Sequence, residues 1–129
     1  MNNWKERKII IEFNNLSFEG LLNDSNTSNL IWDSLPINSS VSTWGDEIYF
    51  SIPVNEEEEE DAKEVVELGD LGFWPPGNAF CIFFGLTPAS SQGEIRPASP
   101  VNIIGSVNGV LDALKQVNPG ESVRISRKH

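Results

Sequence analysis

The sequence predicts a mainly β protein, a closed eight-stranded antiparallel β-barrel with two short helices capping its ends. The chain contains about eight short apolar or alternating segments, each bounded by Gly, Pro, Asn or Asp. Short strands with turn signals between them are typical of antiparallel barrels. Two helix-like segments follow the second strand and precede the last one, where they would cover the barrel ends. No internal repeat or linker divides the chain.

The segment Gly69 to Gly85, GDLGFWPPGNAFCIFFG, is the centre of this pattern and contains five of the twelve aromatic residues. Leu71 to Trp74 has the apolar, aromatic character of a strand. The two prolines that follow cannot donate to a β-ladder, so the strand ends there. Ala79 to Phe84 is continuously apolar, which indicates a strand buried on both faces. One face would point into the barrel and the other would lie under a helix or line a pocket.

The N-terminal third predicts a hairpin followed by a helix. Lys8 to Phe13 and Leu16 to Leu22 are apolar runs joined by a two-residue Asn-Asn turn, the pattern of a β-hairpin. Asp24 and Ser25 are helix-capping residues, and the apolar spacing after them predicts a helix from about Asn26 to Leu35.

The middle of the chain predicts three further strands. Ile37 to Trp44 and Glu47 to Val54 flank a Gly-Asp turn. In the second of these, apolar residues alternate with Glu47, Tyr49 and Ser51, so the strand has one apolar and one polar-aromatic face. Ala62 to Leu68 is predicted as a short strand. Between them, Asn55 to Asp61 (NEEEEED) is predicted as a mobile, exposed acidic loop, because six consecutive carboxylates repel one another.

The C-terminal third begins with the longest loop, between Gly85 and Val101. Val101 to Val107 is then predicted as a strand, Val110 to Val117 as a short helix, and Ser122 to Ser126 as the last strand. Residues 127–129 form a tail.

Composition limits the classes of function. The 129 residues predict a single domain over 1–129 with a core over about 8–126. A formal net charge of −10 and a pI near 4.4 argue against nucleic acid and anionic membranes as partners. No apolar run approaches the ~20 residues of a membrane span, and the N-terminus lacks the pattern of a signal peptide. The single cysteine fits a reducing, cytoplasmic location.

Several motifs together resemble a known family. IWDSLP, WGDEIYFSIPV, VELGDLGFWPPGNAFCIFFGLTP and PASPVNIIG are similar to the small prokaryotic cyclophilin-like proteins, which are classed as a domain of unknown function. The resemblance runs from about Phe18 to Arg124. It implies the eight-stranded cyclophilin-like barrel with one helix after the second strand and one before the last. It implies no established activity.

True cyclophilins are prolyl cis–trans isomerases that use an arginine in a strand motif, FHRxIPxFxxQxGD in pattern, to weaken amide resonance. The corresponding segment here reads STWGDEIYFSIPV and contains no basic residue. The catalytic arginine is therefore not transferred to this chain. Arg96, next to Pro97 in the long loop, is the first candidate for a replacement donor, and Arg124 on the last strand is the second.

Other chemistries have few candidate residues. Cys81 lies within the apolar run, which favours a buried structural thiol, and the only histidine is the terminal His129. Nucleophilic catalysis would lack a nearby base, and zinc would lack ligands. The run Glu56 to Glu60 lacks the alternating ligands and the glycine of a calcium loop. We therefore expect no metal and no cofactor.

The polar-aromatic residues near the turns are the best candidates for a binding site. Core packing is the default role of the phenylalanines, whereas Trp44, Tyr49 and Trp74 carry polar tips suited to a pocket. Asp46 and Glu47 are adjacent, so they point to opposite faces of a strand and cannot act together. Turn formation explains Asp46, while Glu47 shares a face with Tyr49 and is the better functional candidate.

These considerations predict a groove in which the rigid Pro-Pro-Gly turn holds one wall and the long loop forms the edge. The candidate binding residues are Trp44, Glu47, Tyr49, Trp74, Asn78, Phe80, Arg96 and Ser99. The expected function is a peptide or small-ligand binding module without strong catalysis. The alternatives are a prolyl isomerase with a non-standard donor and an unassigned enzyme on the same barrel. The sequence indicates neither the ligand nor the oligomeric state.

Overall fold

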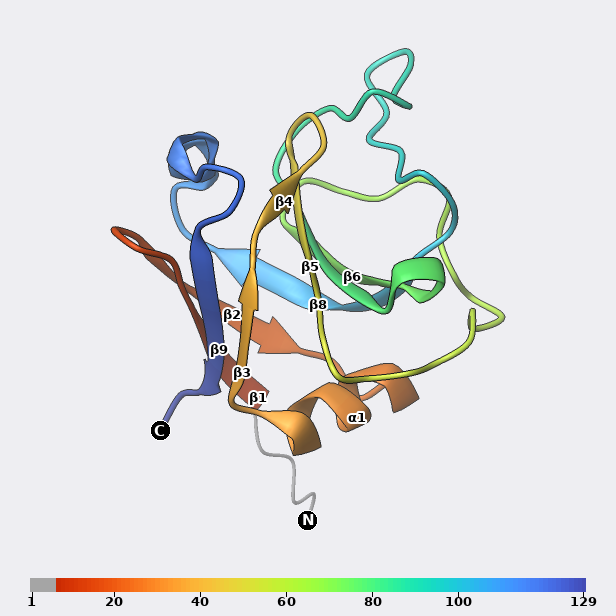
Figure 1. Ribbon diagram of the computed structural model, residues 1–129. Helices are drawn as coiled ribbons and strands as arrows, with labels where there is room; N and C mark the ends of the chain where they lie inside the picture. The colour runs from red at the N-terminus through yellow and green to blue at the C-terminus, as the bar shows by residue number, and fades with distance from the viewer. Residues whose placement is uncertain (1–6) are drawn as a thin grey trace.

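The computed structural model describes residues 7–129 as one antiparallel sheet of nine strands, curled into a nearly closed barrel (Figure 1). The strand order is β3-β9-β1-β2-β8-β6-β7-β5-β4. Residues 1–6 lie outside the described residues. They belong to the predicted domain and form much of the N-terminal segment that lacks the pattern of a signal peptide. The strands are β1 Arg7–Glu12, β2 Ser17–Leu22, β3 Ile37–Ser40, β4 Ser42–Thr43, β5 Glu47–Ser51, β6 Asp70–Trp74, β7 Ala79–Phe83, β8 Asn102–Asn108 and β9 Ser122–Arg127.

The prediction of a closed eight-stranded barrel was wrong in two respects, because the sheet has nine strands and the barrel is not fully closed. The gap in the barrel lies at Val41. The predicted strand from Ile37 to Trp44 is divided there into β3, which pairs with β9, and β4, which pairs with β5. The Val41 amide and carbonyl bond to the turn before β9, at 2.9 Å to Glu121 and 2.8 Å to Gly120. Because the chain changes partners at this residue, no continuous ladder joins the two edges. The two edge strands, β3 and β4, are joined only by the backbone at Val41, so the barrel is not fully closed.

The first hairpin and the helix form as predicted. β1 and β2 pair in register from Arg7 with Leu22 to Glu12 with Ser17. The helix α1 spans Asn26–Ser34, and the Ser25 side chain caps it by accepting a hydrogen bond from the Ser28 amide. Inside the first turn, the Ser28 hydroxyl donates to the Ile104 carbonyl at 2.8 Å, which ties the helix to β8.

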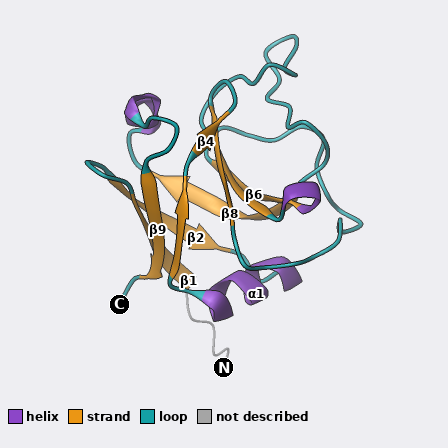
Figure 2. Cartoon of the chain, in the orientation of Figure 1, coloured by secondary structure: helices purple, strands orange, loops and turns teal. Residues whose placement is uncertain are grey.

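Helical segments lie at the two ends of the barrel (Figure 2). α1 crosses one end and inserts the fully buried Ile31 into the core. At the other end lies η2, Leu111–Gln116, whose Leu114 is also buried in the core. The predicted second helix is therefore present, but as a short 3₁₀-helix. A further 3₁₀ turn, η1, occupies Pro75–Gly77.

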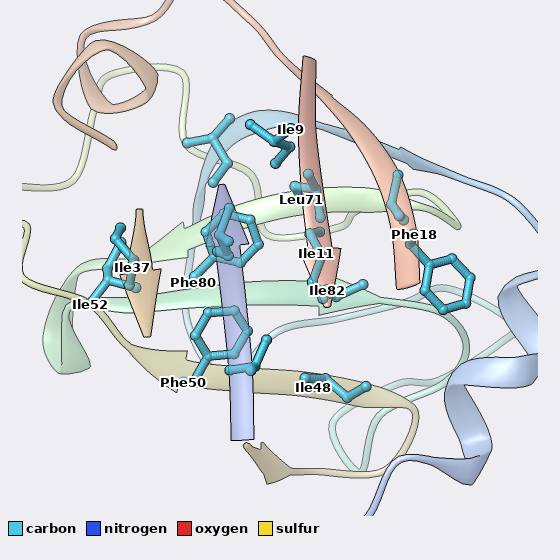
Figure 3. Close-up of a cluster of buried hydrophobic side chains, with 14 of the residues drawn as sticks. Ile9, Ile11, Phe18, Ile37, Ile48, Phe50, Ile52, Leu71, Phe80 and Ile82 are labelled. Atoms are coloured by element: carbon cyan, nitrogen blue, oxygen red, sulfur yellow. The ribbon is translucent and has the colours of Figure 1, made fainter. Parts of the chain in front are cut away.

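The barrel interior is filled by aliphatic and aromatic side chains from every part of the sheet (Figure 3). Phe50 of β5 and Phe80 of β7 stack with ring centroids 5.2 Å apart. Ile9, Ile11, Ile48 and Ile82 surround them without exposure to solvent. Burial of this kind contributes about 25 cal/mol per Å² of apolar surface and dominates the stability of such a fold.

The strand β7 is buried on both faces, as its sequence predicted. Phe80 and Ile82 point into the barrel, whereas Ala79, Cys81 and Phe83 belong to a second apolar cluster outside the wall. That cluster is covered by the segment predicted as a strand over residues 62–68. The strand prediction was wrong, because this segment makes only isolated bridges at Lys63 and Val66.

The acidic loop is largely exposed but is anchored at its centre. The Glu59 amide donates to Asn102 Oδ1 at 2.8 Å, and the Glu59 carboxylate accepts from the Thr27 hydroxyl at 2.6 Å. Asn102, which is fully buried on β8, also donates to the Glu57 carbonyl at 2.9 Å. The predicted mobile, exposed loop is therefore held against α1 and β8 at one residue, Glu59, which the sequence did not reveal.

Among residues 7–129, no group of His, Cys, Asp and Glu side chains is arranged to hold a metal ion. No helix in the same range is long and apolar enough to cross a membrane.

Candidate functional site

The tight turn between β4 and β5 positions two of the candidate residues. Trp44 and Glu47 bond to each other through their backbones, with N···O distances of 2.9 and 3.2 Å. Gly45 between them has φ +62°, and a Cβ there would lie 2.9 Å from the Leu86 carbonyl oxygen. Only glycine suits this combination of positive φ and close approach. The turn is thereby held against the start of the long loop, with Trp44 and Glu47 at its two ends.

The outer face of the barrel wall supplies the floor of the site. Tyr49 of β5 lies opposite Cys81 of β7, and Glu47 lies opposite Phe83. On the other side of β7, Trp74 of β6 pairs with Ala79. Because alternate residues of a strand share a face, this register brings Glu47 and Tyr49 to the same outer surface.

The long loop supplies the remaining wall, and a hydrogen bond fixes its position. The Trp74 indole Nε1 donates to the Ser99 hydroxyl at 2.7 Å. The base of the loop is tied by buried Thr87, whose hydroxyl donates to the Arg96 carbonyl, and by Ser90, whose hydroxyl accepts from the Arg96 amide at 3.1 Å. These contacts place Pro97 next to β6.

The result is a cavity of about 250 Å³ on the outside of the barrel wall. Its lining residues are Trp44, Glu47, Tyr49, Trp74, Pro97 and Ala98. Figure 1 shows the elements that contribute them, namely the β4–β5 turn, β5, β6 and the loop drawn in teal. A largely aromatic and apolar cavity with one carboxyl group is the usual form of a small-ligand site. Its volume lies just below the range of about 300–1,000 Å³ that is usual for such sites.

Glu47 is the only carboxylic acid among the described lining residues, and it is buried. The residue is 6% exposed, and its Oε1 atom accepts no hydrogen bond from any described residue. Burial raises the pKa of the Glu47 carboxyl to about 7, and the neighbouring Cys81 thiol opposes this rise only in part. An acid with such a pKa exchanges its proton near neutral pH, so the carboxyl can accept or donate a hydrogen bond to a bound molecule.

Cys81 behaves as the sequence predicted, as a buried thiol. Loss of solvation, followed by the charge of Glu47, raises its pKa well above the ordinary value. Because the thiolate is the nucleophilic form, this environment makes the thiol unreactive.

The structure brings together five of the eight candidate residues and leaves three apart. Trp44, Glu47, Tyr49 and Trp74 line the cavity, and Ser99 supports the Trp74 ring from behind. The other three are Phe80, Asn78 and Arg96, none of which belongs to the lining.

Each of these three residues has a different role. Phe80 points into the barrel, where it stacks on Phe50. Asn78 adopts a left-handed conformation with φ 47° after η1, and its amide donates to Asn55 at 2.8 Å. Arg96 pairs with Glu94 at 2.9 Å. The second arginine considered, Arg124, lies exposed on β9, where it contacts Asn38 at 3.4 Å.

Two lining residues, Pro97 and Ala98, were not among the predicted site residues. The length of their loop was the only signal in the sequence, because the residue type of an apolar loop residue does not indicate which strand it will pack against.

These features define a nearly closed β-barrel with a small aromatic cavity on its outer wall. A family model described as cyclophilin-like matches residues 7–126. The chain belongs to the cyclophilin-like family.

Two solved structures are similar to this chain. The solution structure of the hypothetical protein AF2241 from Archaeoglobus fulgidus is 44% identical with a TM-score of 0.82, and the match covers 99% of this chain and 100% of that one. The structure of McbB in complex with tryptophan is 17% identical with a TM-score of 0.63, and covers 93% of this chain and 44% of that one. The second likeness shows the fold alone. A comparison with curated proteins returned no match.

Proposed function

We propose that this protein is a binding module that holds a small aromatic or apolar group in the cavity beside Glu47. The cavity itself is the observation that carries the proposal, since three aromatic residues and Pro97 enclose it around one buried carboxyl. The rings of Trp44, Tyr49 and Trp74 offer apolar contact area at little entropic cost. The bound group would be a small molecule or one side chain of a peptide.

The walls of this cavity are held in place before any ligand binds. Trp74 is fixed by Ser99 at 2.7 Å, and the turn containing Gly45 is held against the long loop. A preformed site loses less conformational freedom on binding, which favours affinity for small groups.

Prolyl isomerisation has less support than binding. The reaction would need a hydrogen-bond donor at the bound proline, and the candidate Arg96 is engaged with Glu94 outside the cavity lining. We therefore expect the protein to accelerate isomerisation little or not at all.

The test is a titration of the ¹⁵N-labelled protein with indole and with a short proline-containing peptide, followed by NMR. We expect the largest shifts at Trp44, Tyr49 and the Trp74 indole N–H. Ala98→Phe fills the cavity from an exposed position and should weaken binding by about tenfold or more. Ala89→Phe is the matched control, because Ala89 is an exposed alanine of the same loop outside the lining.

Shifts confined to other regions, or equal effects of the two loop variants, would refute the site. A protease-coupled isomerase assay on the same samples tests the alternative. Robust turnover that Arg96→Ala abolishes would favour the enzyme over the binding module.

A further inference from the structure

We propose that the cavity recognises a protonated amine, a small organic ammonium ion with an apolar or aromatic body, and that the Glu47 carboxylate is its counter-ion. The inference rests on the proposed function and names its ligand class. Glu47 lines the cavity, and one oxygen of its carboxyl has no hydrogen bond within the described chain.

One oxygen of the Glu47 carboxylate, Oε1, lacks the hydrogen-bond partner that a buried carboxylate oxygen requires. The residue is nine-tenths buried, it lines the cavity, and its Oε1 atom accepts no hydrogen bond from the described chain. Removing a carboxylate from water without a partner is costly, whereas a charge-assisted hydrogen bond returns much of that cost. An ammonium group bound in the cavity would direct its N–H donors toward the Glu47 carboxylate, which lines the cavity.

The remaining lining also suits a cation. Trp44, Tyr49 and Trp74 are electron-rich aromatics, and the faces of such rings attract ammonium groups within about 6 Å. The protein has a net charge of −10, which raises the local concentration of cations around it.

The lining also limits the class of amine. The described lining residues include no Lys, Arg or His, so they offer no cationic partner for a ligand carboxylate. We therefore expect a simple amine to bind better than an amino acid with the same ring. A cavity of about 250 Å³ limits the body of the ligand to roughly one ring system.

The proton on Glu47 makes recognition depend on pH. The titratable groups facing it are the Cys81 thiol of β7, whose pKa is raised well above its ordinary value, and Tyr49 on its own strand. Asp46 precedes it, but the Asp46 carboxylate lies against Gly85. With the Glu47 pKa at about 7, the ionised fraction rises about tenfold from pH 6 to pH 8. Ammonium binding should strengthen by the same factor.

The experiment compares three ligands that share one ring, namely tryptamine, its alcohol analogue tryptophol, and L-tryptophan, by calorimetry at pH 6 and pH 8. We expect tryptamine to bind about 10- to 100-fold more tightly than tryptophol at pH 8, the factor typical of a charge-assisted hydrogen bond. Glu47→Gln should abolish this preference and its pH dependence. Glu58→Gln is the control, since it removes the same charge from an exposed position in the acidic loop.

A blocked peptide, acetyl-Gly-Lys-Gly-amide, separates the two sources of an ammonium group. Tighter Glu47-dependent binding of tryptamine assigns the site to free amines, and the reverse assigns it to lysine side chains. Either result supports recognition of an ammonium group.

The outcomes that overturn the inference are distinct from those that overturn the proposed function. If neither the ring compounds nor the lysine peptide binds, the proposed function fails, and the inference fails with it. If tryptophol binds as tightly as tryptamine in the wild type, the cavity is a binding site but Glu47 is not a counter-ion. Tighter tryptamine binding at pH 6 than at pH 8 would also refute the inference, because protonated Glu47 would then act as a donor.

Discussion

Replacing Glu47 by glutamine should change how stability depends on pH. Glutamine has nearly the same shape but does not titrate. Burial raises the pKa of Glu47 from 4.5 to about 7 in the folded protein, so the folded state binds this proton more tightly than the unfolded chain does. The stabilisation that results is fully present below pH ~4.5 and is lost as the pH rises through 7.

The magnitude follows from the two pKa values. A rise from 4.5 to about 7 corresponds to about 3 kcal/mol of unfolding free energy. Because Glu47 is only 6% exposed, solvent screening reduces this value little. The wild-type protein should therefore lose about 3 kcal/mol relative to Glu47→Gln between pH 4.5 and pH 8, most steeply between pH 5 and pH 7.

Urea unfolding of the wild type and of Glu47→Gln at four pH values from 5 to 8 measures this difference. Comparing the two proteins at each pH cancels the contributions of the other carboxyl groups. Glu58→Gln should follow the wild type, because Glu58 is exposed. Parallel curves for Glu47→Gln and the wild type would show that the carboxyl is solvated and titrates normally. A wild type that gains relative stability with pH would require a lowered pKa and would refute the argument about burial.

Two further predictions concern the barrel and its loop. Phe80→Ala should cost about 3–5 kcal/mol in urea unfolding, because it removes a fully buried ring, whereas the exposed Leu68→Ala should cost little. Asn102→Ala should lower the free energy of unfolding by about 2–3 kcal/mol and should speed amide hydrogen exchange over residues 55–61. The reason is that it removes the hydrogen bonds from Asn102 to the Glu59 amide and the Glu57 carbonyl of the acidic loop. The exposed Asn108→Ala is its control, and equal exchange in the two variants would contradict the proposed anchor.

Local patterns in the sequence predicted the strands that such patterns encode well. The strands predicted over Glu47 to Val54 and Ala79 to Phe84 became β5 and β7 with the expected faces, although β5 ends at Ser51 and β7 at Phe83. Period-two alternation and continuous apolarity are local consequences of which faces are buried, so they can be read without knowing the partner strands. The same holds for the turn at Gly45 and for the helix that Ser25 caps.

Where the prediction of the fold failed, the cause lies in contacts between distant segments. The division of one predicted strand at Val41 depends on bonds to Gly120 and Glu121, which no window around residue 41 reveals. The segment over residues 62–68 has strand-like composition, yet it packs over β7 as irregular chain.

The candidate site was also predicted only in part, because it depends on contacts between distant segments. Its polar-aromatic residues are recognisable in sequence because they lie next to turns on a face of known polarity. Phe80 was wrongly included among them because it is close to them in the sequence. In the structure, the alternation of side chains along β7 places Phe80 inside the barrel.

The sequence by itself determined the β-rich barrel, its helix positions, its buried central strand and the aromatic residues near the turns. Each of these follows from residue types at short spacing. Only the tertiary structure decided that Pro97 and Ala98 line a cavity beside Glu47, and that the Oε1 atom of this carboxyl is buried without a hydrogen bond. The environment of Glu47, and with it a pKa near 7, depends on a loop some fifty residues away in the chain, and burial is set by what packs above a residue rather than by its neighbours in sequence.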